Sequence, residues 1–124
     1  MLAKLVKYSI VTALLLLSTA AMADRQSASS AVAEAGAFIQ AAERAEAGRY
    51  AAVELKLARD HLSRARVELE DRSYNSAEDA AIRAKVEAEL AAAKTRASKA
   101  RMALTEMRQT VQTLREELNR QGGQ

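Results

Sequence analysis

The stretch that decides the fold is residues 75–120, NSAEDAAIRAKVEAELAAAKTRASKARMALTEMRQTVQTLREELNR. It contains no proline or glycine, and its apolar residues alternate by four and three positions, which is the spacing of one face of an α-helix. We call this face the heptad seam, and its members are Val86, Leu90, Ala93, Ala97, Ala100, Leu104, Met107, Val111, Leu114 and Leu118. The pattern predicts one long helix that pairs with other helices through this seam.

Two shorter stretches upstream have the same helical period, and they predict helices over residues 29–47 and 51–70. The apolar face of the first is Ala28, Ala31, Ala35, Phe38, Ala42 and Ala45, with Val32 and Ile39 beside it, and that of the second is Leu55, Ala58, Leu62, Ala65 and Leu69. Alanine is abundant, proline is absent, and no run alternates in the manner of a strand. We therefore expect an all-α fold, an antiparallel three-helix hairpin or bundle.

Two breaks separate the predicted helices. Gly48 follows the first and suits a left-handed C-terminal cap. The polar cluster at residues 71–76 follows the second, with Asn75 and Glu78 spaced as in a capping box. Tyr50 and Tyr74 each lie at a helix start, where the ring can fold over the neighbouring hairpin as a staple.

The predicted helices differ greatly in length. The third would be about 69 Å long, whereas each of the first two spans only about 30 Å. The hairpin, residues 29–97, would thus cover the third helix to about residue 96. Residues 98–120 would extend beyond it as a coiled coil, and residues 121–124 would form a disordered tail. The extension has an apolar stripe without an intramolecular partner, composed of Leu104, Met107, Val111, Leu114 and Leu118.

The first 23 residues have the pattern of a cleavable export signal. A basic start, a short apolar run and small residues before the cleavage point are supplied by Lys4 and Lys7, by residues 9–17, and by Ala21 and Ala23. The mature protein would begin at Asp24 with a flexible start, residues 24–28, and would be periplasmic.

Composition restricts the partners. Loss of residues 1–23 removes two lysines and no acid, so the formal net charge falls from +3 to +1. This balance gives no electrostatic reason to expect nucleic acid as a partner. Without cysteine the chain has no lipid anchor of the lipoprotein type, no disulfide and no thiolate metal site. We expect membrane association only if the signal stays uncleaved.

Part of the chain resembles a known family. The resemblance covers residues 29–97 and depends on AAERAEAGRY at residues 41–50, on Glu54-Leu55, Ala58-Arg59 and Leu62, and on Tyr74, Ala77, Ala81 and Ala84. These residues are similar to the bacterial envelope family called domain of unknown function 4398. The family implies exported, alanine-rich helical hairpins, sometimes ahead of a peptidoglycan-binding domain, and it has no assigned catalytic residues. The chain departs from the family at Ala52, where proline is common, and at Arg72-Ser73, where a glycine-containing turn is usual.

No constellation of residues indicates catalysis. His61 is the only histidine, and its neighbour Asp60 points in a different direction on a helix. We expect no cofactor and no metal, and not an enzyme. The favoured hypothesis is a structural or interaction protein of the periplasm that pairs as a coiled coil, with itself as a homodimer or higher oligomer or with another envelope protein. The alternative is a chaperone-like binder of unfolded or outer-membrane clients.

Overall fold

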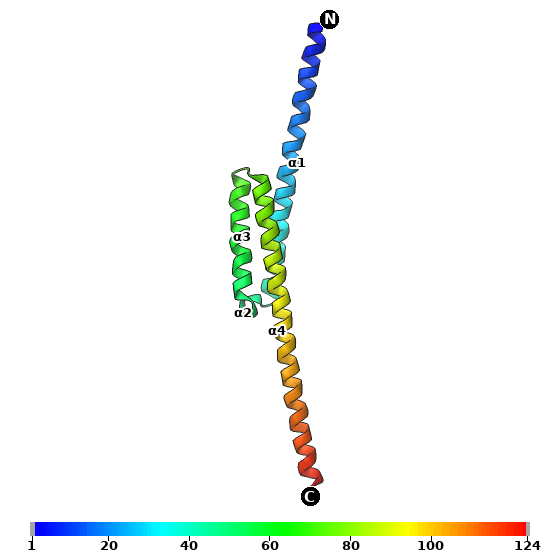
Figure 1. Cartoon of the computed structure of the whole chain (residues 1–124), viewed down its shortest axis with the longest axis vertical. Helices are drawn as coiled ribbons and strands as arrows, with labels where there is room; N and C mark the ends of the chain where they lie inside the picture. Colours follow the sequence, from blue (N-terminus) through cyan, green and yellow to red (C-terminus); the bar gives the residue numbers. More distant parts are fainter. Residues whose placement is uncertain (1, 124) are drawn as a thin grey trace.

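The computed structural model describes the backbone of residues 2–123 and the side chains of residues 22–123. It has four helices, α1 (Leu2–Arg44), α2 (Ala47–Tyr50), α3 (Ala52–Glu70) and α4 (Tyr74–Gly122) (Figure 1). No strand occurs in this part of the chain. The predictions of an all-α fold and of a long C-terminal helix are confirmed.

Three of the helices lie side by side over part of their length. α1 and α4 run in the same direction, α3 runs in the opposite one, and α4 contacts both (Figure 1). We call this part, residues 28–95, the packed region. The first half of α1 and the second half of α4 project from it in opposite directions, which gives the molecule its elongated shape (Figure 1).

Alanine dominates the interior of the packed region. The buried apolar residues are Ala28, Ala35, Ile39, Ala42, Ala47, Ala51, Leu55, Ala58, Leu62, Ala65, Ala77, Ala80, Ala81, Ala84, Ala88 and Ala91. Such small side chains let helix axes approach closely. Ile39, Leu55 and Leu62 are the only larger members of this set, so they account for much of its hydrophobic stabilisation.

The predicted faces of the first two long helices agree with this interior. On α3, four of the five predicted residues are buried, and Leu69 is half-buried. On α1, Ile39 is buried with three of the alanines, while Phe38 and Val32 pack against their edge.

The turn between α1 and α3 differs from the prediction. Glu46, with φ 73°, adopts the left-handed conformation that the sequence assigned to Gly48. Gly48 instead belongs to α2, a single helical turn that the sequence pattern did not predict. The Glu46 amide donates to the Glu43 carbonyl at 2.9 Å, and α1 ends at Arg44 rather than at residue 47 as predicted.

The turn between α3 and α4 is a Schellman motif. The Ser73 amide donates to the Glu68 carbonyl at 2.8 Å, and the Arg72 amide donates to the Leu69 carbonyl at 3.2 Å. Arg72 occupies the left-handed position with φ 60°. α4 then begins with Ser73 as its N-cap, so the predicted capping box at Asn75 does not form.

Both ends of the predicted mature protein are more helical than expected. Residues 24–28, predicted to be flexible, continue α1, and Ala28 is fully buried. Residues 121 and 122, predicted to belong to a disordered tail, continue α4. Of the predicted cleavage site, Ala23 and Asp24 are exposed, whereas the side chain of Ala21 lies outside the described residues. Within residues 22–123, whose side chains the structure describes, no helical stretch is both long and apolar enough to cross a membrane.

Candidate interaction surface

α4 presents two different faces along its first half. The face toward α1 and α3 consists of small residues at three-four spacing, namely Ala77, Ala80, Ala81, Ala84, Ala88, Ala91 and Thr95. Thr95 is polar and fully buried, and its hydroxyl donates to the Ala91 carbonyl at 2.8 Å. This hydrogen bond satisfies the hydroxyl, so that Thr95 packs as a small residue would.

The heptad seam lies on the opposite side of α4, about half a helical turn away at 3.6 residues per turn. Val86 is 54% exposed and Leu90 is 42% exposed, although both lie within the length covered by α1 and α3. The sequence predicted that only the stripe beyond residue 104 would lack an intramolecular partner. The structure corrects this prediction, because the packed helices contact the alanine face instead. Every residue of the seam is therefore exposed, from Val86 to Leu118.

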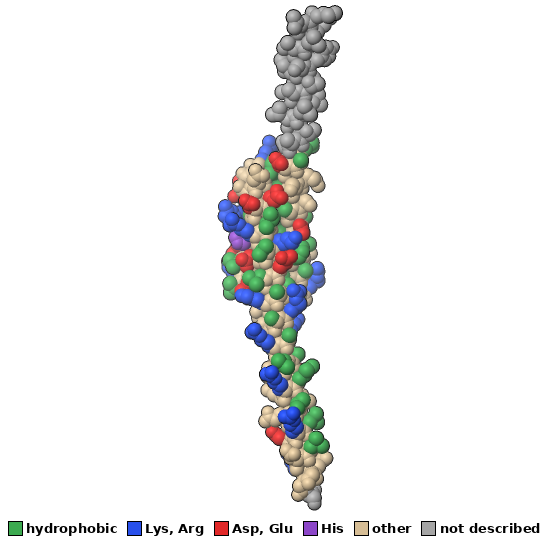
Figure 2. Space-filling view, turned by 45° about the vertical axis from the view of Figure 1, so that its right-hand side comes forward, with side chains coloured by type: hydrophobic (Ala, Val, Ile, Leu, Met, Phe, Trp, Pro, Cys, Tyr) green, Lys and Arg blue, Asp and Glu red, His purple; other side chains and the backbone are tan. Residues whose placement is uncertain are grey.

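Beyond the packed region α4 continues alone. Thr95 is its last buried residue, and every described residue from 99 onward is exposed. We call residues 98–120 the extension. The five predicted seam residues there, Leu104, Met107, Val111, Leu114 and Leu118, are between 47% and 68% exposed. Figure 2 shows the resulting column of hydrophobic side chains along the projecting helix, beside a column of basic ones.

Lys85 joins α4 to α1. Its ammonium group lies 2.7 Å from a carboxylate oxygen of Glu34 and 4.8 Å from the centre of the Phe38 ring. The hydrogen bond to Glu34 raises the pKa of Lys85 above its usual 10.5. The amine thus stays charged, and it lies over the Phe38 ring in a cation–π contact.

Two further lysines of α4 contact carboxylates of the other helices. Lys94 pairs with Glu54 of α3, and Lys99 pairs with Glu46 in the turn after α1. The hydrogen bonds from these lysines lower the pKa of both glutamates below 4.5. The two long helices packed on α4 thus each supply a carboxylate to one of its lysines, and the turn after α1 supplies a third.

The two predicted staple tyrosines lie at the turns. The ring of Tyr50 is half-buried, with the Lys99 ammonium 5.7 Å and the Arg49 guanidinium 5.3 Å from its centre. Tyr50 therefore contacts α4 through a cation, which the sequence reasoning did not foresee. Tyr74 is half-buried at the first residue of α4.

A family model described as "Domain of unknown function (DUF4398)" matches residues 30–107. The chain belongs to the DUF4398 family. The match covers nearly all of the packed region and ends at Met107, so it includes the first turns of the extension. Comparisons with curated proteins and with solved structures gave no match.

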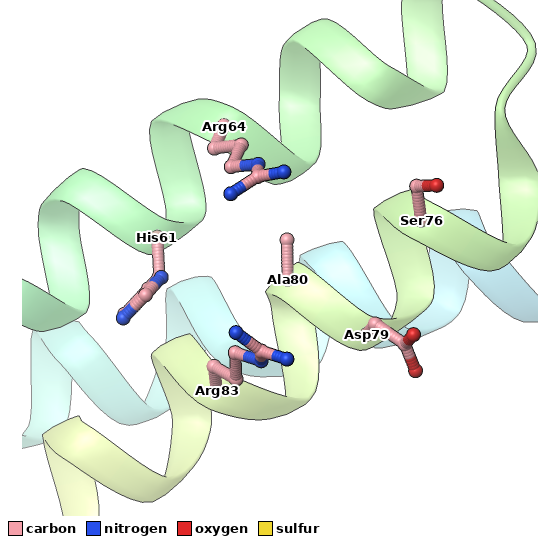
Figure 3. Close-up of a pocket in the computed structure, with 6 residues that line it drawn as sticks. All are labelled: His61, Arg64, Ser76, Asp79, Ala80 and Arg83. Atoms are coloured by element: carbon pink, nitrogen blue, oxygen red, sulfur yellow. The ribbon is translucent and has the colours of Figure 1, made fainter.

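Several basic side chains of this DUF4398 chain line a pocket between α3 and α4. A shallow pocket of about 110 Å³ is lined by His61, Arg64, Ser76, Asp79, Ala80 and Arg83. In Figure 3 Arg64 extends from α3 and Arg83 from α4 toward the space between the helices, while Asp79 points away from it. Arg64 lies 3.7 Å from Glu68, so its charge is partly balanced within α3.

The environment of His61 is that of an ordinary helix residue. The side chain is half-buried, and the neighbouring Asp60 accepts a hydrogen bond from Lys56 at 2.6 Å. Among the side chains described, no group of three or more His, Asp or Glu residues could hold a metal ion. The exposed heptad seam is therefore the feature of the molecule that most needs a functional explanation.

Proposed function

We propose that this protein is a non-enzymatic structural or interaction protein of the bacterial cell envelope, exported to the periplasm by residues 1–23. It forms an antiparallel three-helix bundle whose last helix extends as one strand of a coiled coil. The observation that supports this proposal is the heptad seam, which is exposed along α4, whereas the opposite face of the same helix is buried as far as Thr95. The partner is a second helix, either from another copy or from another envelope protein.

The exposed area makes pairing energetically reasonable. Burying a Leu, Val or Met side chain completely contributes about 1.5–3 kcal/mol. Roughly half of each of the five seam side chains of the extension is exposed. Burying this exposed half in an interface would contribute about 4–8 kcal/mol from this helix. A partner seam of similar composition doubles that sum, which is comparable with the entropic cost of association.

The test is photo-crosslinking in intact cells. A photoreactive residue at Val111, on the seam, should give one discrete adduct, whereas the same residue at Gln109, off the seam, should not. The substitution Leu114→Glu should abolish the adduct from position 111, and the matched change Gln109→Glu should preserve it. Equal adduct from positions 111 and 109, or an adduct insensitive to Leu114→Glu, would refute pairing through the seam.

Cell fractionation tests export, and the size distribution of the crosslinked adducts tests the alternative function. Release of the protein by osmotic shock, with an N-terminus at Asp24, is expected for a cleaved and exported chain. A broad ladder of adducts of many sizes would instead favour the alternative function, a chaperone-like binder of clients.

A further inference from the structure

We infer that the partner of the extension is a helix of a different protein, with acidic residues beside its own apolar seam. This inference depends on the proposed function and identifies the partner by its charge. Its basis is a row of basic residues that recurs every seven positions beside the seam. The row consists of Lys94, Arg101, Arg108 and Arg115.

Each member of this basic row directly follows a seam residue, so it borders the surface that a partner helix would cover. Arg108 and Arg115 lie together with Met107 and Val111 around one shallow depression in the surface of the extension. The extension as a whole has five basic and three acidic side chains, a net charge of +2. Charged residues in this flanking position select the partner of a coiled coil by forming salt bridges with it.

The packed region shows what such a residue pairs with. Lys94, the first member of the row, is paired with Glu54 of α3, the helix packed beside it. Among the ion pairs of the described residues, none involves Arg101, Arg108 or Arg115. These three arginines continue the row where no other helix of the chain is adjacent. An approaching helix with glutamates or aspartates at the facing positions would complete the same type of pair.

A second copy of the chain does not supply these carboxylates. In an antiparallel pair the basic rows of the two copies would face each other, placing arginine against arginine. In a parallel pair the row would face the opposite flank, which is Arg96, Ala103, Thr110 and Glu117. Arg96 would then oppose Arg101, while Glu117 would oppose Gly122. Neither orientation matches an arginine of the row with an acid, so self-pairing is electrostatically unfavourable.

The shape of the stripe favours a helix over an anionic lipid surface. Interfacial helices bury a broad apolar face that commonly includes Trp or Phe. The apolar residues of the extension instead follow the narrow three-four seam of a coiled coil, and residues 98–120 contain no aromatic side chain.

The experiment uses the whole chain and three synthetic helical peptides with the same Leu/Val seam and with Glu, Gln or Lys on the flanks. Binding is measured by fluorescence anisotropy. Three exposed ion pairs of ordinary strength should make the Glu peptide bind about tenfold more tightly than the Gln peptide. The Lys peptide should bind most weakly. These differences should shrink between about 0.1 M and about 1 M salt, because the screening length falls.

A charge-reversed variant tests the arginines themselves. The triple change Arg101→Glu, Arg108→Glu and Arg115→Glu should invert the order of the peptides. The control is Arg120→Glu. Arg120 is not a member of the row, and its guanidinium lies 3.4 Å from the Glu117 carboxylate, so this change should leave the order of the peptides unchanged. Far-ultraviolet circular dichroism establishes that each variant remains helical.

The other outcomes separate the two proposals. Equal binding of all three peptides that Leu114→Glu abolishes would overturn the acidic partner but leave pairing through the seam intact. A homo-oligomer that Leu114→Glu dissociates would likewise overturn the acidic partner and leave pairing through the seam intact. Binding to phosphatidylglycerol vesicles but to none of the peptides would overturn both proposals, as would peptide binding that Leu114→Glu does not change.

Discussion

Replacing Arg72 by glycine is expected to stabilise the protein, although it removes a charged side chain. Arg72 holds a left-handed backbone, φ 60°, at the end of α3. That conformation costs a residue with a Cβ about 1–2 kcal/mol, and glycine avoids the cost. The greater freedom of glycine in the unfolded chain offsets about 0.5–1 kcal/mol of this gain. The net increase in unfolding free energy should therefore be about 0.5–1 kcal/mol.

Urea denaturation followed by circular dichroism measures this change, and thermal denaturation should give a midpoint about 2–8 °C higher. The control is Arg72→Ala, which removes the same charge but retains a Cβ, and which should not stabilise. If Arg72→Gly is no more stable than Arg72→Ala, the left-handed conformation is not the source of the cost. The reasoning would then be refuted.

Three further predictions concern the packed region. Gly36→Ala should raise the unfolding free energy by up to about 1 kcal/mol in urea titrations, because Gly36 lies inside α1 and alanine is the better helix former. The added methyl group would lie 3.9 Å from the Leu62 side chain, an ordinary contact. A loss of stability would show that the helices have no room for this methyl group. Leu62→Ala should cost about 2–5 kcal/mol in the same assay, whereas exposed Val53→Ala should cost under about 0.5 kcal/mol, and equal effects would contradict the assigned core. The third prediction concerns pH. Because the hydrogen bond from Lys94 lowers the pKa of Glu54 below 4.5, stabilisation by this carboxylate is complete above pH 4.5 and is lost as the pH falls through the folded-state pKa. The advantage of wild type over Glu54→Gln should therefore be present at about pH 7 and decline toward about pH 3, and a constant advantage would contradict the pairing.

The sequence predicted the interior correctly where large and small apolar residues share one face. On α3, Leu55 and Leu62 alternate with alanines, and the structure buries them together. On α4 the two kinds of residue lie on opposite faces. The pattern of larger side chains drew attention to the seam, whereas the buried stripe that includes Ala84 and Ala91 contains no large residue to distinguish it. The three-four spacing of small residues that ends at Thr95 was the sequence feature that could have identified this buried face.

Turn geometry was harder to predict, because two residues with a Cβ occupy left-handed positions. Glycine is the usual residue there, so the sequence assigned that role to Gly48 rather than to Glu46. The second left-handed residue is Arg72. It lies in the turn where the family usually has a glycine, so the departure from the family pattern pointed to this turn. The pairing of Lys99 with Glu46 joins residues far apart in the chain, and only the folded arrangement brings them together.

The continuity of α4 affects how easily its second half becomes ordered. An isolated helix must first form a costly nucleus, and a peptide as short as residues 98–120 would be marginally helical in water. Here the preceding turns of α4 are already held by the alanine face, so the extension grows by propagation alone from Thr95. A binding partner would meet a helix that is already formed. Less conformational entropy would be lost on binding, and the affinity would be correspondingly higher.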